Sequence, residues 1–190
     1  MKNLHLLVGL GNIGSEYELT RHNFGFLLLD QIIADYGFNK IAAKKFHSEV
    51  FSGQIADHKI IAIKPHTFMN RSGMAVSEAG SFYKITHKNI IVLHDEIDLV
   101  LGKIRVKIGG GSAGHNGLKS IDEAMGKDYV RLRLGVGRPQ NQDFEVADYV
   151  LSKFSKEELE KVGQVNKKIS KSFVELLEGS LDSFVNDFYL

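Results

Sequence analysis

The sequence predicts an α/β fold, a single three-layer domain over residues 1–190 in which a central mixed, twisted β-sheet is flanked by helices. In the first half of the chain, short apolar runs alternate with segments of helical periodicity. In the second half, two segments alternate strictly between apolar and basic residues, which is typical of strands with one exposed face. A length of 190 residues suits one hydrophobic core more readily than two.

The expected elements of the first half are bounded by glycine, proline or capping residues. They are a strand over residues 4–8 that ends at Gly9, a helix over 23–36 capped by Asn23 and closed by Gly37, a strand over 60–63 stopped by Pro65, a helix over 72–82 and a strand over 90–93. The last of these strands delivers His94, Asp95 and Glu96 at its end.

The second half begins with a strand that has one basic and one apolar face. The basic residues Lys103, Arg105 and Lys107, expected to be exposed, interleave with Ile104, Val106 and Ile108, expected to be buried. Residues 129–134 repeat this alternation with Arg131 and Arg133 outward, so the two strands can present one basic surface. A short helix over 116–125 lies between them, and an amphipathic helix over 155–178 is expected to pack on the sheet.

Composition excludes several kinds of protein. The absence of cysteine removes disulfides, thiolate nucleophiles and cysteine zinc sites, and it suits a reducing, cytoplasmic location. No apolar stretch approaches the roughly 20 residues of a membrane span, and the run from Leu4 to Leu10 enters a glycine turn without a cleavage site. With a net charge of +1, any affinity for nucleic acid must come from local clusters of basic residues.

Two short glycine motifs suggest functions that their surroundings do not support. Residues 9–14 match the G-x-G-x-x-G fingerprint of dinucleotide-binding oxidoreductases, but no helix is expected to open at these glycines and no acid ends a following strand. Residues 110–114 match the G-x-S-x-G elbow of serine hydrolases around Ser112, but the last histidine, His115, is too close to be its partner.

A dispersed polar set at expected strand ends and loops offers a more coherent chemistry. It comprises Asn12, residues 20–23, residues 69–70, residues 94–96 and residues 115–117. The set supplies a histidine base, a carboxylate to orient it and amides that can hold a water or a carbonyl. Alternatively, Asn12, Asn23 and Asn116 are turn and cap residues. His94 and His115 are more plausible as supporting residues, and no histidine pair has the H-E-x-x-H spacing of a zinc site.

These segments also resemble, in order and spacing, the motifs of bacterial peptidyl-tRNA hydrolases between Leu6 and Pro139. The matching motifs are Gly9-Leu10-Gly11-Asn12, Glu16-Tyr17, Thr20-Arg21-His22-Asn23, Pro65 with residues 67–73, His94-Asp95-Glu96-Ile97-Asp98-Leu99 and residues 109–117. The chain departs from the family pattern at Ile13 and Ala113, where proline and glycine are common, and near Val100, where proline is common. These departures affect loop shape rather than chemical groups.

The resemblance implies a monomeric enzyme that needs no cofactor or metal and cleaves the ester between a peptide and the terminal ribose of tRNA. It makes His22 the catalytic base and Asp95 its partner. The positions that it implies for substrate are Asn12, Tyr17, Phe68, Asn70, His115 and Asn116, and those for tRNA phosphate are Lys107 and Arg133, with Arg105 beside them.

Histidine suits this reaction because its ordinary pKa of about 6.5 leaves it neutral and still basic near pH 7. Asp95 would fix the ring tautomer, water would replace the serine of a hydrolase triad, and Asn116 or a glycine-loop amide would stabilise the oxyanion. A tRNA-binding module without catalysis and a dinucleotide oxidoreductase remain as alternatives.

Overall fold

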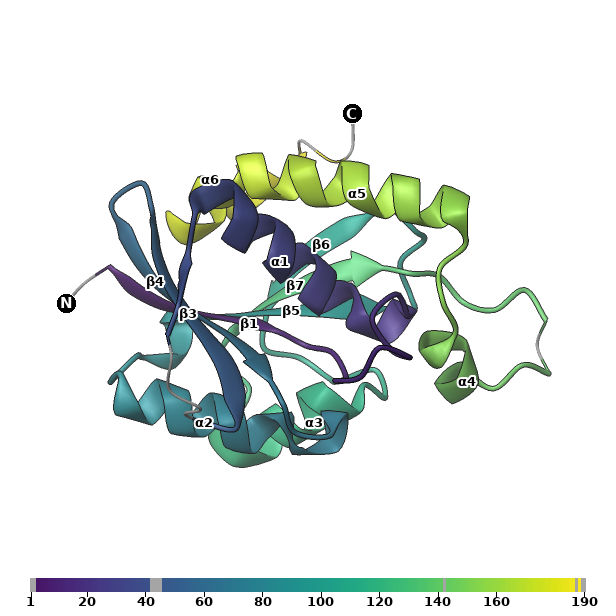
Figure 1. The fold of residues 1–190 in the computed structure, drawn as a ribbon, viewed down its shortest axis with the longest axis horizontal. Coiled ribbons are helices and arrows are strands. Elements are labelled where there is room, and N and C mark those ends of the chain that lie inside the picture. The colour runs from purple at the N-terminus through teal and green to yellow at the C-terminus, as the bar shows by residue number, and fades with distance from the viewer. Residues whose placement is uncertain (1–2, 42–45, 142, 187, 189–190) are drawn as a thin grey trace.

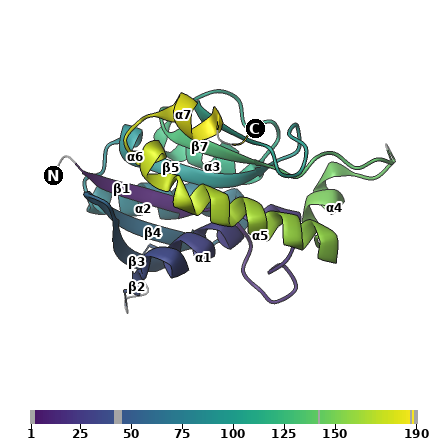
Figure 2. The ribbon, with the colours of Figure 1, turned by 90° about the horizontal axis from the view of Figure 1, so that it is seen from above.

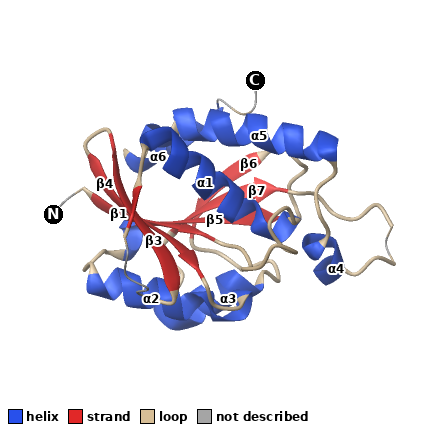
Figure 3. Ribbon diagram, viewed as in Figure 1, coloured by secondary structure: helices blue, strands red, loops and turns tan. Residues whose placement is uncertain are grey.

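The computed structural model describes residues 3–41, 46–141, 143–186 and 188. The strands of this part of the chain form one seven-stranded sheet in the order β2-β3-β4-β1-β5-β7-β6. They are β1 Leu4–Gly9, β2 Asn39–Lys40, β3 Ser48–Ile55, β4 His58–Pro65, β5 Ile90–Glu96, β6 Ile104–Ile108 and β7 Val130–Gly135. The β1–β4, β1–β5 and β5–β7 pairs are parallel and the other three are antiparallel, which confirms the mixed sheet (Figure 3).

Helices cover both faces of the sheet and complete the three layers (Figure 1). One face carries α1 Phe24–Tyr36, α5 Lys156–Lys171, α6 Phe173–Leu177 and α7 Leu181–Asn186, and the other carries α2 Ser72–Phe82 and α3 Asn116–Met125. Figure 2 shows α5 crossing above the sheet and α4, Val146–Leu151, lying beyond one end of the strands. No helix of the described residues is long and apolar enough to cross a membrane.

The two faces of the central strands contribute to separate cores. Leu7 and Leu93 pack with α1 and the C-terminal helices, whereas Val8 and Val92 pack with α2 and α3. Because side chains alternate along a strand, a continuous apolar run of this kind is what a strand covered on both sides requires. All seven residues of β5 are buried, so Asp95 and Glu96 extend this buried strand as its last two residues.

Most elements of the first half lie where the sequence predicts them, and Gly37 ends α1 in the left-handed conformation with a φ of 62°. The prediction omitted β2, β3 and the short helices α4 and α7. It was also wrong in making residues 155–178 one helix, because α5 ends at Lys171 and α6 begins at Phe173. The Tyr36 hydroxyl donates to the carbonyl of Ser170 at 2.8 Å, so this carbonyl in the last turn of α5 bonds to the neighbouring helix.

The predicted exposures of two residues of β6 and β7 were wrong. Arg131 lies on the predicted face, opposite Lys107, but it is 2% exposed rather than free in solvent, because α3 and the glycine-rich loop cover it and it donates to Asp122 and to the carbonyl of Gly111. Ile108 was expected to be buried, but it ends the edge strand β6 and is 56% exposed. The basic surface of these strands is therefore narrower than the alternation predicts.

Candidate active site

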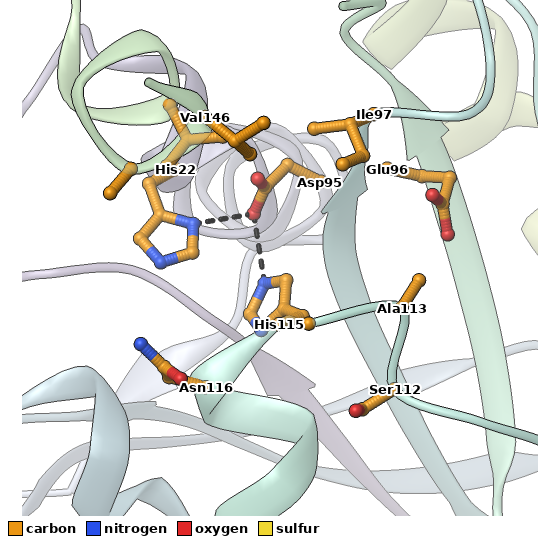
Figure 4. A pocket seen from close by; sticks show the side chains of 12 residues that line it. His22, Asp95, Glu96, Ile97, Ser112, Ala113, His115, Asn116 and Val146 are labelled. Carbon is orange, nitrogen blue, oxygen red and sulfur yellow. Dashed lines mark hydrogen bonds and ion pairs between the residues drawn. The ribbon is translucent and has the colours of Figure 1, made fainter.

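The parallel strands bring the predicted polar residues to one edge of the sheet. Because β1, β4, β5 and β7 run in the same direction, their carboxyl ends lie together, and this is where open α/β sheets bind ligands. The loop after β1 leads to the 3₁₀ turn η1, Arg21–Asn23, and the loop after β4 leads to η2, Met69–Arg71. The glycine-rich loop before α3 reaches the same edge (Figure 4).

His22 and Asp95 form a buried pair at this edge. The Nδ1 atom of His22 lies 2.9 Å from Oδ1 of Asp95, and the two residues are 9% and 3% exposed. An ionised carboxylate accepts hydrogen bonds, so Nδ1 of His22 donates and Nε2 is left with its lone pair. Figure 4 shows this second nitrogen facing away from Asp95, on the side of Asn116.

His115 holds the same carboxylate from the other side. It is the N-cap of α3, and its Nδ1 accepts hydrogen bonds from the backbone amides of Gly117 and Leu118 at 3.1 and 3.4 Å. Because Nδ1 accepts, Nε2 carries the ring proton and donates to Oδ1 of Asp95 at 2.9 Å. One oxygen of Asp95 therefore accepts from both histidines.

The charges at this cluster favour a proton on His22 and none on Asp95. Burial disfavours the charged ring of His22, but the charge and hydrogen bond of Asp95 outweigh it and raise the pKa of His22 above its ordinary value. Burial alone would raise the pKa of Asp95, yet His22, His115 and their hydrogen bonds hold it well below its usual range. The carboxylate thus stays ionised while His22 remains a base that titrates above 6.5.

His94 contacts both Asp95 and His115 and so supports the cluster. Its Nδ1 donates to the backbone carbonyl of Asp95 at 2.7 Å, and its ring packs edge-on against His115 with centroids 5.3 Å apart. Burial and the neighbouring His115 lower the pKa of His94 to about 3, so its ring stays neutral. The expectation that His94 is a supporting residue agrees with these contacts.

A cavity of about 300 Å³ opens beside the cluster. It is lined by His22, Asp95, Glu96, Ile97, Ser112, Ala113, Gly114, His115, Asn116, Val146, Ala147 and Val150. The glycine-rich loop forms one wall and α4 supplies an apolar one. The α4 wall is the main part of the site that the sequence did not predict, because a six-residue helix is too short to show periodicity.

The side chains of Asn23 and Asn116 do not cap helices, although the alternative interpretation of the sequence made them turn or cap residues. Asn23 makes no capping bond to α1, because its side chain donates to the carbonyl of Asn12 at 2.9 Å and accepts from the Asn12 amide at 2.8 Å. Asn23 therefore holds the loop that carries Asn12. His115, rather than Asn116, caps α3, which leaves the exposed Asn116 at the mouth of the cavity.

The remaining residues predicted for substrate lie outside the lining of the His22 cavity. Asn70 is exposed in η2, where Met69 packs on α3 so closely that a Cβ at Gly117 would lie 2.7 Å from its sulfur. Phe68 is 78% exposed just before this turn. Tyr17 is half-buried in the loop after β1, and Asn12 lines a second cavity of about 470 Å³ beside this loop.

The predicted tRNA residues occupy one face of β6 and β7. Arg105 lies opposite Arg133 in the antiparallel register, and Lys107 lies opposite the buried Arg131. Arg133 forms an ion pair with the buried Glu96, in which its Nε and one terminal nitrogen lie 2.9 and 2.8 Å from Oε2. Arg105 and Lys107 are exposed, and Lys107 lies against the glycine-rich loop.

One group of residues has the composition of a metal site. Single ligand atoms of His22, Asp95 and His115 lie within 4.8 Å of one another. These nitrogens point their protons at the carboxylate, and Nδ1 of His115 is already bonded to the start of α3, so an ion would have to displace hydrogen bonds. The site geometry suits a hydrogen-bonded cluster, and the absence of a metal requirement remains a prediction.

The two glycine motifs do not form the sites for which they are named. After residues 9–14 the chain continues as a loop until η1 begins at Arg21, so no helix N-terminus faces these glycines as a dinucleotide fold requires. Ser112 lines the cavity but lies apart from His22, beyond His115, in Figure 4. Both ring nitrogens of His115 are engaged elsewhere.

An α/β sheet with a histidine oriented by a buried aspartate at its carboxyl edge is the layout of a small hydrolase that works by general-base catalysis. A model of the family "Peptidyl-tRNA hydrolase" matches residues 6–189. The chain belongs to this peptidyl-tRNA hydrolase family, a family of enzymes, as the sequence motifs predicted.

The similarity to known proteins extends over almost the whole chain. Peptidyl-tRNA hydrolases of Wolbachia sp. subsp. Drosophila simulans and Rickettsia canadensis are 52% and 47% identical, covering 96% and 95% of this chain and 98% and 97% of their own lengths. The crystal structure of peptidyl-tRNA hydrolase from Acinetobacter baumannii superposes with a TM-score of 0.91 at 38% identity, covering 99% of this chain and 95% of that one.

Proposed function

We propose that this protein hydrolyses the ester between the carboxyl end of a peptide and the 3′-terminal ribose of tRNA, releasing the peptide and free tRNA. Membership of the peptidyl-tRNA hydrolase family supports the reaction. The observation that carries the mechanism is the hydrogen bond of 2.9 Å that directs Nδ1 of His22 to Asp95 and leaves Nε2 beside the cavity.

His22 acts as the general base. Its Nε2 takes a proton from a water molecule as the water oxygen attacks the ester carbonyl, and Asp95 stabilises the imidazolium that forms. The proton then passes to the ribose oxygen as the ester bond breaks. General-base catalysis of this kind contributes roughly 10²- to 10⁴-fold. His115 positions Asp95 and is not itself the base, since both of its ring nitrogens are engaged.

Asn116 stabilises the negative charge that develops on the carbonyl oxygen. It is the first residue of α3, it is exposed, and it lines the cavity that His22 also lines. A side-chain amide donor already aimed at the oxyanion costs no reorganisation during the reaction. The glycine-loop amides on the same wall are the alternative donors, and Asn116→Asp, which replaces the donor by a carboxylate, tests the assignment.

The substrate extends from the cavity in two directions. The peptide and the tRNA end contact residues of two loops beside the cavity. The loop after β1 contributes Asn12 and Tyr17, and the segment after β4 contributes Phe68 and Asn70. Arg105, Lys107 and Arg133 on β6 and β7 hold the tRNA phosphates, because cationic side chains on one strand face can follow a phosphate backbone. Of these three residues, Arg105 and Lys107 are exposed, whereas Arg133 forms an ion pair with Glu96.

The central test compares His22→Ala with His87→Ala, which changes an exposed histidine far from the site. An N-blocked aminoacyl-tRNA is the substrate, with and without a chelator, and release of the blocked amino acid is measured. We expect the first variant to fold and to lose hydrolysis, the second to retain it, and the chelator to have no effect. Near-normal turnover by folded His22→Ala would overturn the mechanism, and binding without release by the wild type would favour a tRNA-binding module.

The tRNA surface is tested separately with Lys107→Ala and the control Lys88→Ala, an exposed lysine on η3. We expect Lys107→Ala to weaken tRNA binding and to lower the log–log salt dependence of binding by about one. Hydrolysis of a minimal peptidyl ester should stay unchanged. Equal losses on both substrates would argue against phosphate binding.

We also propose that the protein works as a single domain and as a monomer in the cytoplasm, without a metal ion. The one continuous sheet supports the single domain, the lack of cysteine supports the cytoplasm, and the hydrogen bonds of the candidate metal ligands support the lack of a metal, whereas the monomer is what the family resemblance implies. Sedimentation at increasing protein concentration tests the oligomeric state.

A further inference from the structure

The side chain of Arg21, the residue before His22, is bound by α4, by the link that follows it and by the first turn of α5. It is 8% exposed, although arginine is seldom buried without partners. One terminal nitrogen donates to the Ser152 hydroxyl at 2.9 Å and to the Lys153 carbonyl at 2.7 Å. The other donates to both carboxylate oxygens of Glu158 at 2.7 and 2.8 Å.

The backbone on either side of Arg21 is joined to the same segment. Thr20 and Lys153 form an antiparallel bridge, and the Arg21 amide donates to the Ser152 carbonyl at 3.1 Å. The Arg21 guanidinium carbon lies 4.6 Å from the centre of the Tyr149 ring on α4. Arg21 thus contacts α4, the link after it and the first turn of α5.

These contacts connect two parts of the cavity that are far apart in the sequence. The turn η1 supplies His22, and α4 supplies Val146, Ala147 and Val150 to the opposing apolar wall. A planar guanidinium can donate from one terminal nitrogen to the Glu158 carboxylate and from the other to the 152–153 link while it stacks on a ring, which the single nitrogen of a lysine cannot do. One side chain therefore fixes the base and the α4 wall relative to each other.

We infer that Arg21 is a positioning residue: Glu158 of α5 holds its guanidinium in place, and its contacts with Tyr149, Ser152 and Lys153 keep the α4 wall of the cavity against the turn that carries His22. The inference rests on the proposed function for its kinetic consequence, while its structural part stands on the contacts alone. Arg21 does not line the cavity, so it acts through its neighbours and not on the substrate.

The sharpest test changes Glu158, which does not line the cavity and belongs to the first turn of α5. Glu158→Gln removes the charge that Arg21 binds and keeps an oxygen for the capping bond from the Ser155 amide. Glu157→Gln is the matched control, because it removes an exposed charge from the same turn. Arg21→Lys is the stronger variant.

We expect Glu158→Gln to lower kcat/KM on N-blocked aminoacyl-tRNA about fivefold and Arg21→Lys about thirtyfold, each measured well below its unfolding temperature. The double variant should be no worse than Arg21→Lys, since both changes break the same interaction. Glu157→Gln should match the wild type. Wild-type kcat/KM in folded Glu158→Gln and Arg21→Lys would overturn the inference, and Glu158→Gln alone decides if Arg21→Lys does not fold.

Amide hydrogen exchange separates this inference from the proposed function. If α4 depends on Arg21, the amides of residues 146–151 exchange faster in Glu158→Gln than in Glu157→Gln, whether or not the protein is active. An inactive wild type with this difference would refute the proposed function and retain the positioning role. Equal exchange in both variants would refute the positioning role.

Discussion

Two pairs of neighbouring histidines lie at opposite ends of the same sheet, and the pKa values of one member of each, His22 and His5, shift in opposite directions. At the carboxyl ends of the strands, His22 and His115 share one oxygen of Asp95. At the amino ends, Nε2 of His5 on β1 lies 3.0 Å from Nδ1 of His58 on β4. The pKa of His22 is raised, whereas burial and the neighbouring His58 lower the pKa of His5 to about 4.

The comparison shows that burial does not decide whether a histidine can act as a base near neutral pH. His22 and His5 are 9% and 7% exposed, so both lose similar access to water. The difference lies in the partner, because a carboxylate favours the charged ring and a second imidazole does not. A buried histidine becomes a useful base only where the fold places an ionised acid beside it.

The largest effect is expected for Asp95→Asn, which keeps the shape of the side chain and removes the charge that acts on His22. We expect kcat to fall about 10³- to 10⁴-fold, the scale seen when the aspartate that orients a catalytic histidine is neutralised. In the wild type, activity rises with pH as His22 loses its proton, at a pH above 6.5 because its pKa is raised. Without the charge, burial alone acts on the ring, so this rise should move to lower pH.

Asp98→Asn is the control for this experiment, because Asp98 is an exposed carboxylate near the same strand end that pairs with Arg138. Its kcat and pH profile should match those of the wild type. A pH profile of Asp95→Asn that stays in place while kcat falls would show that Asp95 orients His22 without raising its pKa.

A smaller effect is expected for His115→Asn. The Oδ1 atom of asparagine can take the place of Nδ1 and keep the cap of α3, but it cannot reach Asp95 as Nε2 does. Losing one hydrogen bond to a charged group should lower kcat about tenfold. Asp95 would then interact more strongly with His22, so the rise in activity should move to higher pH. An unchanged kcat and pH profile would show that His115 only caps the helix.

The parts of the fold and site that depend on local pattern could be predicted from the sequence. Short apolar runs predicted β1, β4 and β5, because buried parallel strands need continuous apolar residues. The pairing of His22 with Asp95 was suggested by the family resemblance and by positions at strand ends, and the structure brings the two side chains together.

The rest depends on contacts between distant segments. Arg131 alternates like a surface residue, yet it is buried because Asp122 and the Gly111 carbonyl, which no periodicity reveals, accept its hydrogen bonds. Asn23 stands where a helix cap would, but its side chain binds Asn12 instead. The partners of Arg21 lie more than 130 residues along the chain, so its role was invisible in the sequence.

A carboxylate placed beside His5 should shift its pKa in the direction seen for His22. In His58→Asp, an aspartate Oδ1 can occupy the position of Nδ1, which lies 3.0 Å from Nε2 of His5. The pKa of His5, now about 4, should rise, while the neutral control His58→Asn should leave it low. Titration of the His5 ring by NMR measures the shift directly, and hydrolysis should be unaffected because this end of the sheet lies opposite the site.

The same substitution should change how stability depends on pH. In the wild type the folded pKa of His5, about 4, is below its ordinary value of 6.5, so the unfolded chain binds more protons between these values. Stability therefore rises by about 1 to 3 kcal/mol from pH 4 to 6.5 on account of this group. Urea unfolding of His58→Asp should show a smaller rise than His58→Asn. If His5 of His58→Asp still titrates near 4, the partner does not control the proton affinity of a buried histidine, and the contrast with His22 must have another cause.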